Sequence, residues 1–350
     1  MSAAQSDARG GHPGLRVTRP GMLTSLQDLG RYGLQHLGIV PGGAMDSFAH
    51  RIANALVGNP AEAATLECTL LGPTVVVDCD ALVALYGAEF AAKADGHAFP
   101  RNRPVLLKAG ATLSMGSASR GARAYLAVAG GFQVPEVLGS RSTYIPAAFG
   151  GLSGRAVKAG DRLPCSDDVA QISASRFENA GPRASSTDNT GMRTVSWFAP
   201  ELNMPKGGPM IVRAMDGRHH SQFDSASREA FVGHPWRISS NSNRMGYRLE
   251  GPRLTRSSPV DILSEPTCLG TVQVPNDGAP IALMADHQTT GGYPKIAEIA
   301  GADIAGLAQL APGASVRFVM CSLDEAEAAR RASEARLQSV LQSIESIYNR

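Results

Sequence analysis

The sequence lacks several features that identify common classes of protein. No stretch of its 350 residues approaches the roughly 20 apolar residues that a membrane-spanning helix needs, and residues 1–13 lack the apolar core of a signal peptide. The 33 lysines and arginines nearly balance the 31 aspartates and glutamates, so a net charge of +2 gives no general attraction to nucleic acid or membranes. These absences predict a soluble, cytoplasmic protein whose partners include neither nucleic acid nor a membrane.

Cysteine and the common catalytic motifs are also scarce. The five cysteines form no C-x-x-C pair, so the sequence indicates neither a zinc site nor a disulfide framework, and we expect reduced, mostly buried thiols. The pair His219-His220 has no carboxylate or cysteine at ligand spacing, so no metal site is predicted. The chain also has no P-loop, no G-x-G-x-x-G dinucleotide motif and no G-x-S-x-G motif of a serine hydrolase.

Aromatic residues make up only 5% of the chain, whereas glycine (38) and proline (22) are abundant. This composition predicts many tight turns between short strands, and it argues against a helical bundle. Helices are expected at residues 45–56, 221–231 and 323–350, the last preceded by a capping box from Ser322 and Glu325. Strands are expected at residues 15–18 (an edge strand), 74–77, 81–85, 105–107, 112–115, 124–128, 210–212, 260–262, 271–274, 281–284 and 315–319.

Short patterns recur in the two halves of the chain. Arg31 and Arg244 each begin an R-x-G-x-x-x-x-G pattern, and Glu67 and Glu265 each begin an E-x-T-x-L-G pattern. A third matching pair, residues 107–113 and 310–316, follows in the same order. The repeats predict a duplicated domain, and two such modules packed together create a cleft that suits a functional site.

The duplication and the composition together set the expected domain boundaries. We expect a disordered tail at residues 1–14, a first domain at 15–165, a polar linker at 166–193, a second domain at 194–322 and a helix at 323–350. The apolar stripe of that helix is expected to pack on its own domain, and docking on another protein of a complex is the alternative.

A series of short segments carries a resemblance to a known family. These are Gln27–Arg31, Gly42–Asp46, Ala129–Phe132, Leu138–Tyr144, Gly154-Arg155, Gly160-Asp161, Asn243–Tyr247 and Gln288–Lys295. In order and spacing they resemble the biotin-dependent carboxyltransferase family, also called allophanate hydrolase subunit 2-like, over about residues 15–320. The resemblance implies a mainly β fold of tandem cyclophilin-like β-barrels with a few short helices, in agreement with the duplication.

The resemblance also implies partners and an activity. Family members include the C subunit of bacterial 5-oxoprolinase, and they act with a homologous B subunit and often with an A subunit. The function favoured is therefore that of the C subunit of an ATP-dependent 5-oxoprolinase, which opens the lactam 5-oxo-L-proline to L-glutamate and is inactive without its partners. ATP with Mg²⁺ is then expected at the level of the complex.

Two alternative functions stay open. The first is the carboxyltransferase component of a biotin-dependent urea or amide carboxylase, or of an allophanate hydrolase-type system, with biotin as the cofactor. The second is a non-enzymatic antagonist of a kinase inhibitor.

The densest polar stretch of the chain runs from Asp286 to Lys295, inside the second repeat. Lys295 can balance an anion or a developing oxyanion, and Arg244 can grip a carboxylate or phosphate with two parallel hydrogen bonds. Asp286 can orient or accept a proton, so these three are the expected catalytic residues. The expected substrate-binding residues are Gln288, Thr289, Thr290, Tyr293, Arg31, Gln27, Asp28 and Asp46.

Structural roles compete with several of these assignments. Arg31 and Arg244 can each pair with the glutamate of their own repeat as a clasp that holds the domain together. Asp46 can cap the helix expected at 45–56, where an anion complements the helix dipole. The stretch up to Lys295 can be a β-turn with a surface lysine.

Overall fold

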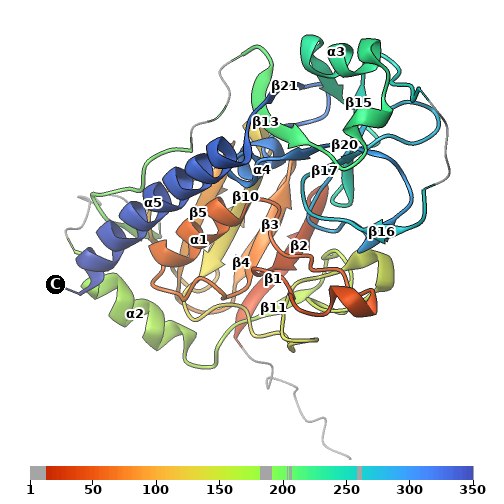
Figure 1. Cartoon of the computed structure of the whole chain (residues 1–350). Helices are drawn as coiled ribbons and strands as arrows, with labels where there is room; N and C mark the ends of the chain where they lie inside the picture. The colour runs from red at the N-terminus through yellow and green to blue at the C-terminus, as the bar shows by residue number, and fades with distance from the viewer. Residues whose placement is uncertain (1–12, 182–190, 203, 205–206, 258–261, 350) are drawn as a thin grey trace, which may run out of the picture.

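The structure is a computed structural model that describes residues 13–181, 191–202, 204, 207–257 and 262–349. Most of the tail predicted at residues 1–14 lies outside the described residues, as does most of the strand predicted at 260–262. The described chain forms two β domains and a long C-terminal helix that starts at the second domain and runs along the first (Figure 1).

The first domain contains two six-stranded sheets. One sheet has the order β11-β1-β4-β9-β6-β7, and the other has the order β12-β8-β5-β10-β3-β2. In chain order their strands are β1 (Gly14–Arg19), β2 (Leu23–Gln27), β3 (Thr65–Thr69), β4 (Thr74–Val77), β5 (Ala81–Phe90), β6 (Lys93–Ala94), β7 (His97–Ala98), β8 (Val105–Leu107), β9 (Thr112–Ser114), β10 (Ala118–Val128), β11 (Arg162–Pro164) and β12 (Met192–Thr194).

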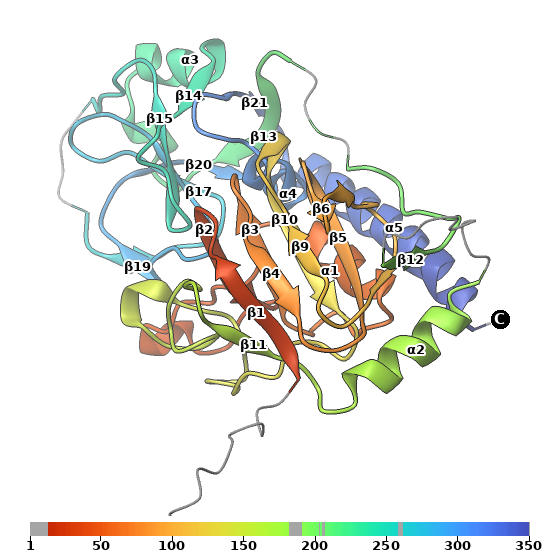
Figure 2. The same ribbon diagram turned by 180° about the vertical axis from the view of Figure 1, so that it is seen from behind.

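The sheet that contains β5 and β10 is buried on both faces, which explains the nearly continuous apolar sequence of its strands. Along β5, Val83 and Leu85 point into the core between the two sheets, whereas Leu82 and Ala84 join a second core beneath the helices. Figures 1 and 2 show the molecule from opposite sides, with α1 (Ser47–Leu56), α2 (Val169–Asn179) and α5 (Leu323–Tyr348) on one side of this sheet and β1 on the other.

The second domain is a closed barrel with the strand order β13-β20-β17-β18-β15-β14-β21. Closure comes from the parallel pairing of β13 with β21, so the barrel has no free edge. Its elements are β13 (Met210–Asp216), α3 (Ser225–Gly233), β14 (Trp236–Ile238), β15 (Gly246–Glu250), β17 (Thr271–Gln273), β18 (Ile281–Leu283), β20 (Lys295–Ile299), α4 (Gly301–Ala308) and β21 (Ser315–Met320). A separate pair, β16 (Glu265–Pro266) and β19 (Thr290–Gly291), lies beside it, and short 3-10 turns are η1 (Gln35–Leu37), η2 (Ile145–Ala147) and η3 (His220–Gln222).

The expectation of a mainly β fold with a C-terminal helix is confirmed, and three details are corrected. The strand at β1 is not an edge strand, because it pairs with β11 on one side and with β4 on the other. The segment predicted as a linker contains α2, whose three buried positions Val169, Ser173 and Phe177 are spaced by four residues and are too few to stand out in the sequence. Its end forms β12, which pairs with β8 of the first domain.

The C-terminal helix α5 links the two domains. It begins with the expected capping box, in which the Ser322 side chain accepts from the Glu325 backbone while the Glu325 side chain accepts from Ser322. Its buried residues Leu337 and Ile344 pack in the core above the first domain rather than on the second barrel that it follows, and the Tyr348 hydroxyl donates to the Leu56 carbonyl at 2.6 Å. The stripe thus packs on the first domain, which corrects the expectation that it covers its own.

Other sequence expectations are met only in part. All five cysteines are free thiols, of which two are buried, two are half-buried and Cys268 is exposed. None of the helices in the described part of the chain has the length and apolar character required to cross a membrane.

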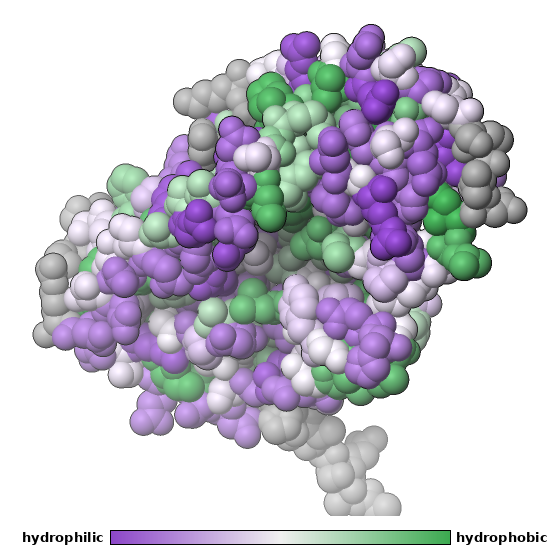
Figure 3. Space-filling view, in the orientation of Figure 1, coloured by the Kyte–Doolittle hydropathy of each residue, from purple (hydrophilic) through white to green (hydrophobic). Residues whose placement is uncertain are grey.

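The space-filling view shows that the face carrying α5 is hollowed between the second barrel and the rest of the molecule (Figure 3).

Candidate functional site

Arg244 lies just before β15 and joins the two domains. Its Nε and Nη2 donate to the two carboxylate oxygens of Asp286, each at 2.9 Å, which makes a bidentate ion pair. Nη2 also donates to the Gly43 carbonyl at 2.6 Å, and Nη1 donates to the carboxylate of Glu67 on β3. Because Gly43 and Glu67 belong to the first domain, this one side chain is a clasp across the domain junction.

The clasp is crosswise, which corrects the expected pairing within each repeat. Arg244 pairs with the glutamate of the other repeat, whereas Glu265 pairs with Lys295, 2.9 Å away. The reason is that side chains alternate between the two faces of strand β3. Leu66 and Cys68 fill the core of the first domain, so Glu67 points to the opposite face. That face meets the second barrel.

Glu67 is fully partnered within this junction. One carboxylate oxygen accepts from the Met45 backbone at 2.9 Å and from the Tyr125 hydroxyl at 2.8 Å, while the other accepts from Arg244. Burial alone raises the pKa of Glu67, but the guanidinium groups of Arg244 and Arg123 outweigh burial, and the pKa lies below its usual value. With Asp286 included, two carboxylates face two guanidinium groups.

Arg31 occupies the equivalent position in the first repeat but is held differently. Its Nη2 donates to the Ser142 carbonyl at 2.6 Å, its Nε donates to the Val137 carbonyl at 3.3 Å, and its guanidinium lies 4.8 Å from the centre of the Phe149 ring. The side chain is only 1% exposed, yet Nη1 has no hydrogen-bond partner among the described residues. A buried guanidinium with an unused donor is unfavourable unless a ligand or water completes it.

Gly42 lies beside both that donor and Asp286. A Cβ atom on Gly42 would lie 3.4 Å from Arg31 Nη1 and 3.6 Å from Asp286 Oδ1, so these two atoms are no more than about 7 Å apart, the sum of the two distances. Tyr144 lies close to the same carboxylate, since burial and the charge of Asp286 both raise the pKa of its phenol. We call this arrangement of Arg31, Gly42 and Asp286 the junction site.

The junction site offers a donor and an acceptor to one small group. An amide, which carries a carbonyl and an N–H, complements Arg31 Nη1 and Asp286 Oδ1. Asp286 is only 2% exposed and Arg31 only 1%, so neither is open to solvent in this conformation. A ligand therefore reaches them only if the surrounding loops move.

Asp28 and Gln27 hold the loops that build this site. Asp28 accepts from the hydroxyls of Ser140 and Ser142 at 2.6 and 2.5 Å, and these bonds anchor the loop whose carbonyls hold Arg31. Burial raises the pKa of Asp28, but the hydrogen bonds lower it further, and the net shift is downward. Gln27 donates to the Ser25 hydroxyl at 2.9 Å and to the Thr143 carbonyl at 3.2 Å.

Asp46 serves as the helix cap that the sequence allowed. Its Oδ1 accepts from the Ala49 backbone at 2.9 Å at the start of α1, and its Oδ2 accepts from Gln309 Nε2 at 2.7 Å. Its own backbone N–H donates to the Tyr125 hydroxyl at 2.8 Å, which places it next to the Glu67 cluster. Burial raises the pKa of Asp46 to about 6.

Lys295 belongs to a second polar cluster, on the barrel beneath β16 and β19. Its ammonium lies 2.9 Å from Glu265 and donates to the Pro266 carbonyl at 2.5 Å. Arg218, 3.2 Å from Glu265, adds a second cation. Glu298 is a further carboxylate nearby, whose pKa is raised by burial. Lys295 is thus neutralised by its own domain and is only 7% exposed.

The polar stretch that leads to Lys295 is divided between these two clusters and the surface. Asp286 joins the junction site, whereas Gln288 donates to Gln273 at 3.0 Å in the Lys295 cluster. The Thr289 carbonyl accepts from the Thr267 backbone at 3.0 Å, and Thr290 and Tyr293 are exposed. Among the described residues no group of His, Cys, Asp and Glu is placed to hold a metal ion.

Four residues of the junction were not among the predicted site residues. Glu67 stood in a repeated motif and Tyr144 in a segment that resembles the family, but the sequence did not indicate their partners. Arg123 on β10 and Gln309 at the end of α4 carried no signal, because their contacts arise where elements distant in the chain pack together.

Comparisons with known proteins identify relatives over most of the chain. The C subunit of the 5-oxoprolinase of Escherichia coli (strain K12) is 44% identical over 317 residues, which cover 91% of this chain and 94% of that protein. The protein of the same name from Haemophilus influenzae is 36% identical over 90% of this chain and 94% of its own length. The crystal structure of the K. lactis urea amidolyase superposes with a TM-score of 0.82 at 29% identity, over 95% of this chain and 20% of that chain.

A family model agrees with these relatives. Residues 37–320 match the model described as carboxyltransferase domain, subdomain A and B. The match begins after β1 and β2 of the first domain, includes the second domain and ends before α5. The chain therefore belongs to the carboxyltransferase-domain subdomain A and B family.

Proposed function

We propose that this chain is the C subunit of a 5-oxoprolinase, which opens the lactam ring of 5-oxo-L-proline to give L-glutamate. The observation that carries the proposal is the 44% identity with the C subunit of the E. coli 5-oxoprolinase, which extends over nearly the full length of both proteins. The junction site supports it, because a lactam presents a carbonyl oxygen and an N–H on the same edge.

In this proposal Arg31 and Asp286 hold the lactam. The unused Nη1 of Arg31 donates to the carbonyl oxygen, polarises it and balances negative charge that develops there. Asp286 Oδ1 accepts from the lactam N–H, and Arg244 fixes that carboxylate through its bidentate pair. Both charged groups are buried, so their interactions with a bound amide are stronger than in water.

Amide resonance makes the lactam carbonyl a poor electrophile, and we propose that MgATP, bound at the level of the complex, activates it. Transfer of the γ-phosphoryl group to the carbonyl oxygen releases ADP. Water then adds to the carbonyl carbon, and the C–N bond opens to give an acyl phosphate. A second water hydrolyses that acyl phosphate to L-glutamate and phosphate.

The A and B subunits complete the enzyme in this proposal. The junction site is closed to solvent in the isolated chain, since Arg31 and Asp286 are 1% and 2% exposed. Contact with a partner that shifts the loops around Gly42 and Tyr144 would open it. This requirement fits a chain that is inactive alone.

The role of Lys295 stays a prediction. Its ammonium is engaged by Glu265, so we expect it to hold β16 against the barrel or to act only after that pair opens. Turnover by a Lys295→Ala variant in the reconstituted complex checks this: wild-type turnover would remove Lys295 from the catalytic residues.

The experiment that tests the function measures glutamate release from 5-oxo-L-proline by the three proteins of the complex, with and without ATP. Each protein is omitted in turn. ATP-dependent release that disappears without this chain is the expected result. No release from the complete, assembled set would contradict the proposal.

A second candidate, carboxyl transfer from carboxybiotin to urea or another amide, is favoured by the likeness to the K. lactis urea amidolyase at a TM-score of 0.82. A junction site that binds amides suits this reaction too. Biotin-dependent carboxylation of urea by this chain, supplied with a biotin carboxylase and a biotin carrier, would support it over ring opening.

A further inference from the structure

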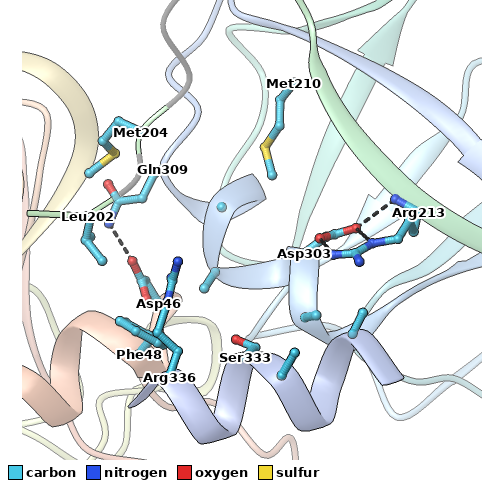
Figure 4. Close-up of a pocket in the computed structure, with 15 residues that line it drawn as sticks. Asp46, Phe48, Leu202, Met204, Met210, Arg213, Asp303, Gln309, Ser333 and Arg336 are labelled. Carbon is cyan, nitrogen blue, oxygen red and sulfur yellow. Dashed lines mark hydrogen bonds and ion pairs between the residues drawn. The ribbon is translucent and has the colours of Figure 1, made fainter. Parts of the chain in front are cut away.

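A cavity of about 430 Å³ lies where α4, α5, β13 and the start of α1 meet (Figure 4). None of Arg31, Gly42, Arg244 and Asp286 lines it, so it is distinct from the junction site. Its α5 wall lies beyond the residues that match the family model. A volume of this size is within the range of small-molecule sites, roughly 300–1,000 Å³.

Small side chains on two facing helices create the space. Both α4 and α5 present alanine or glycine to the cavity, and the residues are Ala302, Ala305, Gly306, Ala329 and Ala332. Met210 lies directly over α4, since a Cβ atom on Gly306 would be 2.4 Å from the end of its side chain. Phe48 and Met210 supply apolar surface on opposite sides of the cavity (Figure 4).

Most of the charge around the cavity is already paired. Asp303 accepts from the backbone and from two guanidinium nitrogens of Arg213, at 2.5 to 2.9 Å. Asp46 accepts from Ala49 and Gln309, although its Oδ2 keeps acceptor capacity toward the cavity. Arg213 neutralises Asp303, and Arg336 balances the charge of Asp46, so the cavity walls carry no net negative charge that would repel an anion.

Arg336 is the exception. Its guanidinium lies 4.9 Å from the centre of the Phe48 ring, and among the described residues no hydrogen bond or ion pair engages it. Figure 4 shows the side chain reaching from α5 past Phe48 in the direction of Asp46. Asp46 and Arg336 both act on the pKa of Tyr86, which places the two charges near the same phenol.

We propose that this cavity binds a small carboxylate that carries an N–H donor beside the carboxyl group, such as an amino acid or a cyclic amide acid. Arg336 takes the carboxylate, Asp46 Oδ2 accepts from the N–H, and the short carbon skeleton lies between Phe48 and Met210.

The test is isothermal titration of the full chain with four probes of similar size. The probes 5-oxo-L-proline and L-glutamate carry both groups, 2-pyrrolidinone lacks the carboxylate, and cyclopentanecarboxylate lacks the N–H. We expect saturable binding of at least one of the first two, with affinity lower by about tenfold or more for the last two.

Three variants locate the binding. Arg336→Gln removes the proposed carboxylate partner, and Ala332→Leu fills the cavity from an exposed helical position, so each should weaken binding by about tenfold or more. Arg331→Gln removes an equal charge from the same helix at a residue paired with Glu327, and it should bind as the wild type does.

Titrations repeated in an Arg31→Gln background separate the cavity from the junction site. Binding that survives Arg31→Gln but is lost in Arg336→Gln supports the cavity, whether or not the chain proves to belong to a 5-oxoprolinase. No saturable binding by the wild type, or binding unchanged in both Arg336→Gln and Ala332→Leu, overturns the proposal.

Discussion

Arg31 and Arg244 begin the same motif in two copies of one module, yet they end in opposite states. Arg244 uses Nε and both terminal nitrogens on two carboxylates and a carbonyl, and it ties the domains together. Arg31 is as deeply buried but is held by backbone carbonyls, with Nη1 unused. One arginine of the repeated motif thus ties the domains together, whereas the other keeps a buried donor without a partner among the described residues.

The two glutamates of the repeats differ in the same way. Glu67 reaches across the junction to Arg244, whereas Glu265 stays within its barrel and pairs with Lys295. Because Glu265 pairs with Lys295, the second repeat supplies no glutamate to Arg31, and the two repeated motifs therefore make different contacts.

The largest effect that separates the two arginines is on stability. Arg244→Ala leaves Asp286 buried without its cation and Glu67 with only the more distant Arg123, so the free energy of unfolding should fall by about 3–5 kcal/mol. Urea unfolding of the isolated chain measures it. Arg248→Ala, an exposed arginine on β15, is the matched control and should change stability by less than about 0.5 kcal/mol. Equal, small losses in both would mean that the clasp does not hold the domains.

Arg31→Gln should reduce turnover by the complex more than it reduces the stability of the chain. Glutamate release by the assembled complex should fall by about 100-fold or more, as when one donor to a developing oxyanion is removed. The free energy of unfolding should fall by only about 1–3 kcal/mol, because the carbonyls of Ser142 and Val137 lose a donor, while Asp286 keeps its pair with Arg244 and Asp28 keeps its hydrogen bonds. A variant that loses stability as Arg244→Ala does, with turnover retained, would make Arg31 a second clasp.

Gly42→Ala tests the position beside Gly42 in the junction site. Its φ of +65° makes any side chain strained by about 1–2 kcal/mol, and the new Cβ would lie 3.4 Å from Arg31 Nη1 and 3.6 Å from Asp286 Oδ1. Gly38, with a φ of +81° and no atom within 4 Å of such a Cβ, is the matched control. Both alanine variants should lose similar stability in thermal unfolding, and only Gly42→Ala should lose turnover. Equal turnover in the two would show that no substrate occupies this position.

The smallest effect is on acid stability. The folded-state pKa of Glu67 lies below the usual 4.5, so the unfolded chain binds this proton more readily than the folded chain. Its contribution to stability is therefore fully present above about pH 4.5 and is lost as the pH falls further. The unfolding free energy of Glu67→Gln should accordingly depend less on pH than that of the wild type in this range. If the unfolding free energies of the wild type and Glu67→Gln depend equally on pH in this range, the clasp does not set the charge of Glu67.

Local features of the chain were predictable because they depend on neighbours in sequence. The helix at α1 and its cap by Asp46, the capping box of α5 and several short strands follow from spacing and turn residues. The missed helix α2 has too few apolar positions to show a period, and the position of β1 inside its sheet depends on partners about 60 and 145 residues away, at Val76 and Arg162.

The sequence by itself determined that the chain is mainly β, it predicted a duplication from repeated motifs, and it marked Arg31, Arg244, Asp286 and the two glutamates as residues of interest. These features can be read from the sequence because periodicity depends on neighbouring residues and repeated motifs can be aligned with each other. Only the tertiary structure decided that Arg244 pairs with Glu67 rather than Glu265, and that Lys295 is neutralised away from the junction site. The reason is that partner choice depends on which strand face meets the other domain, and a charge acquires its role from what surrounds it when water is removed.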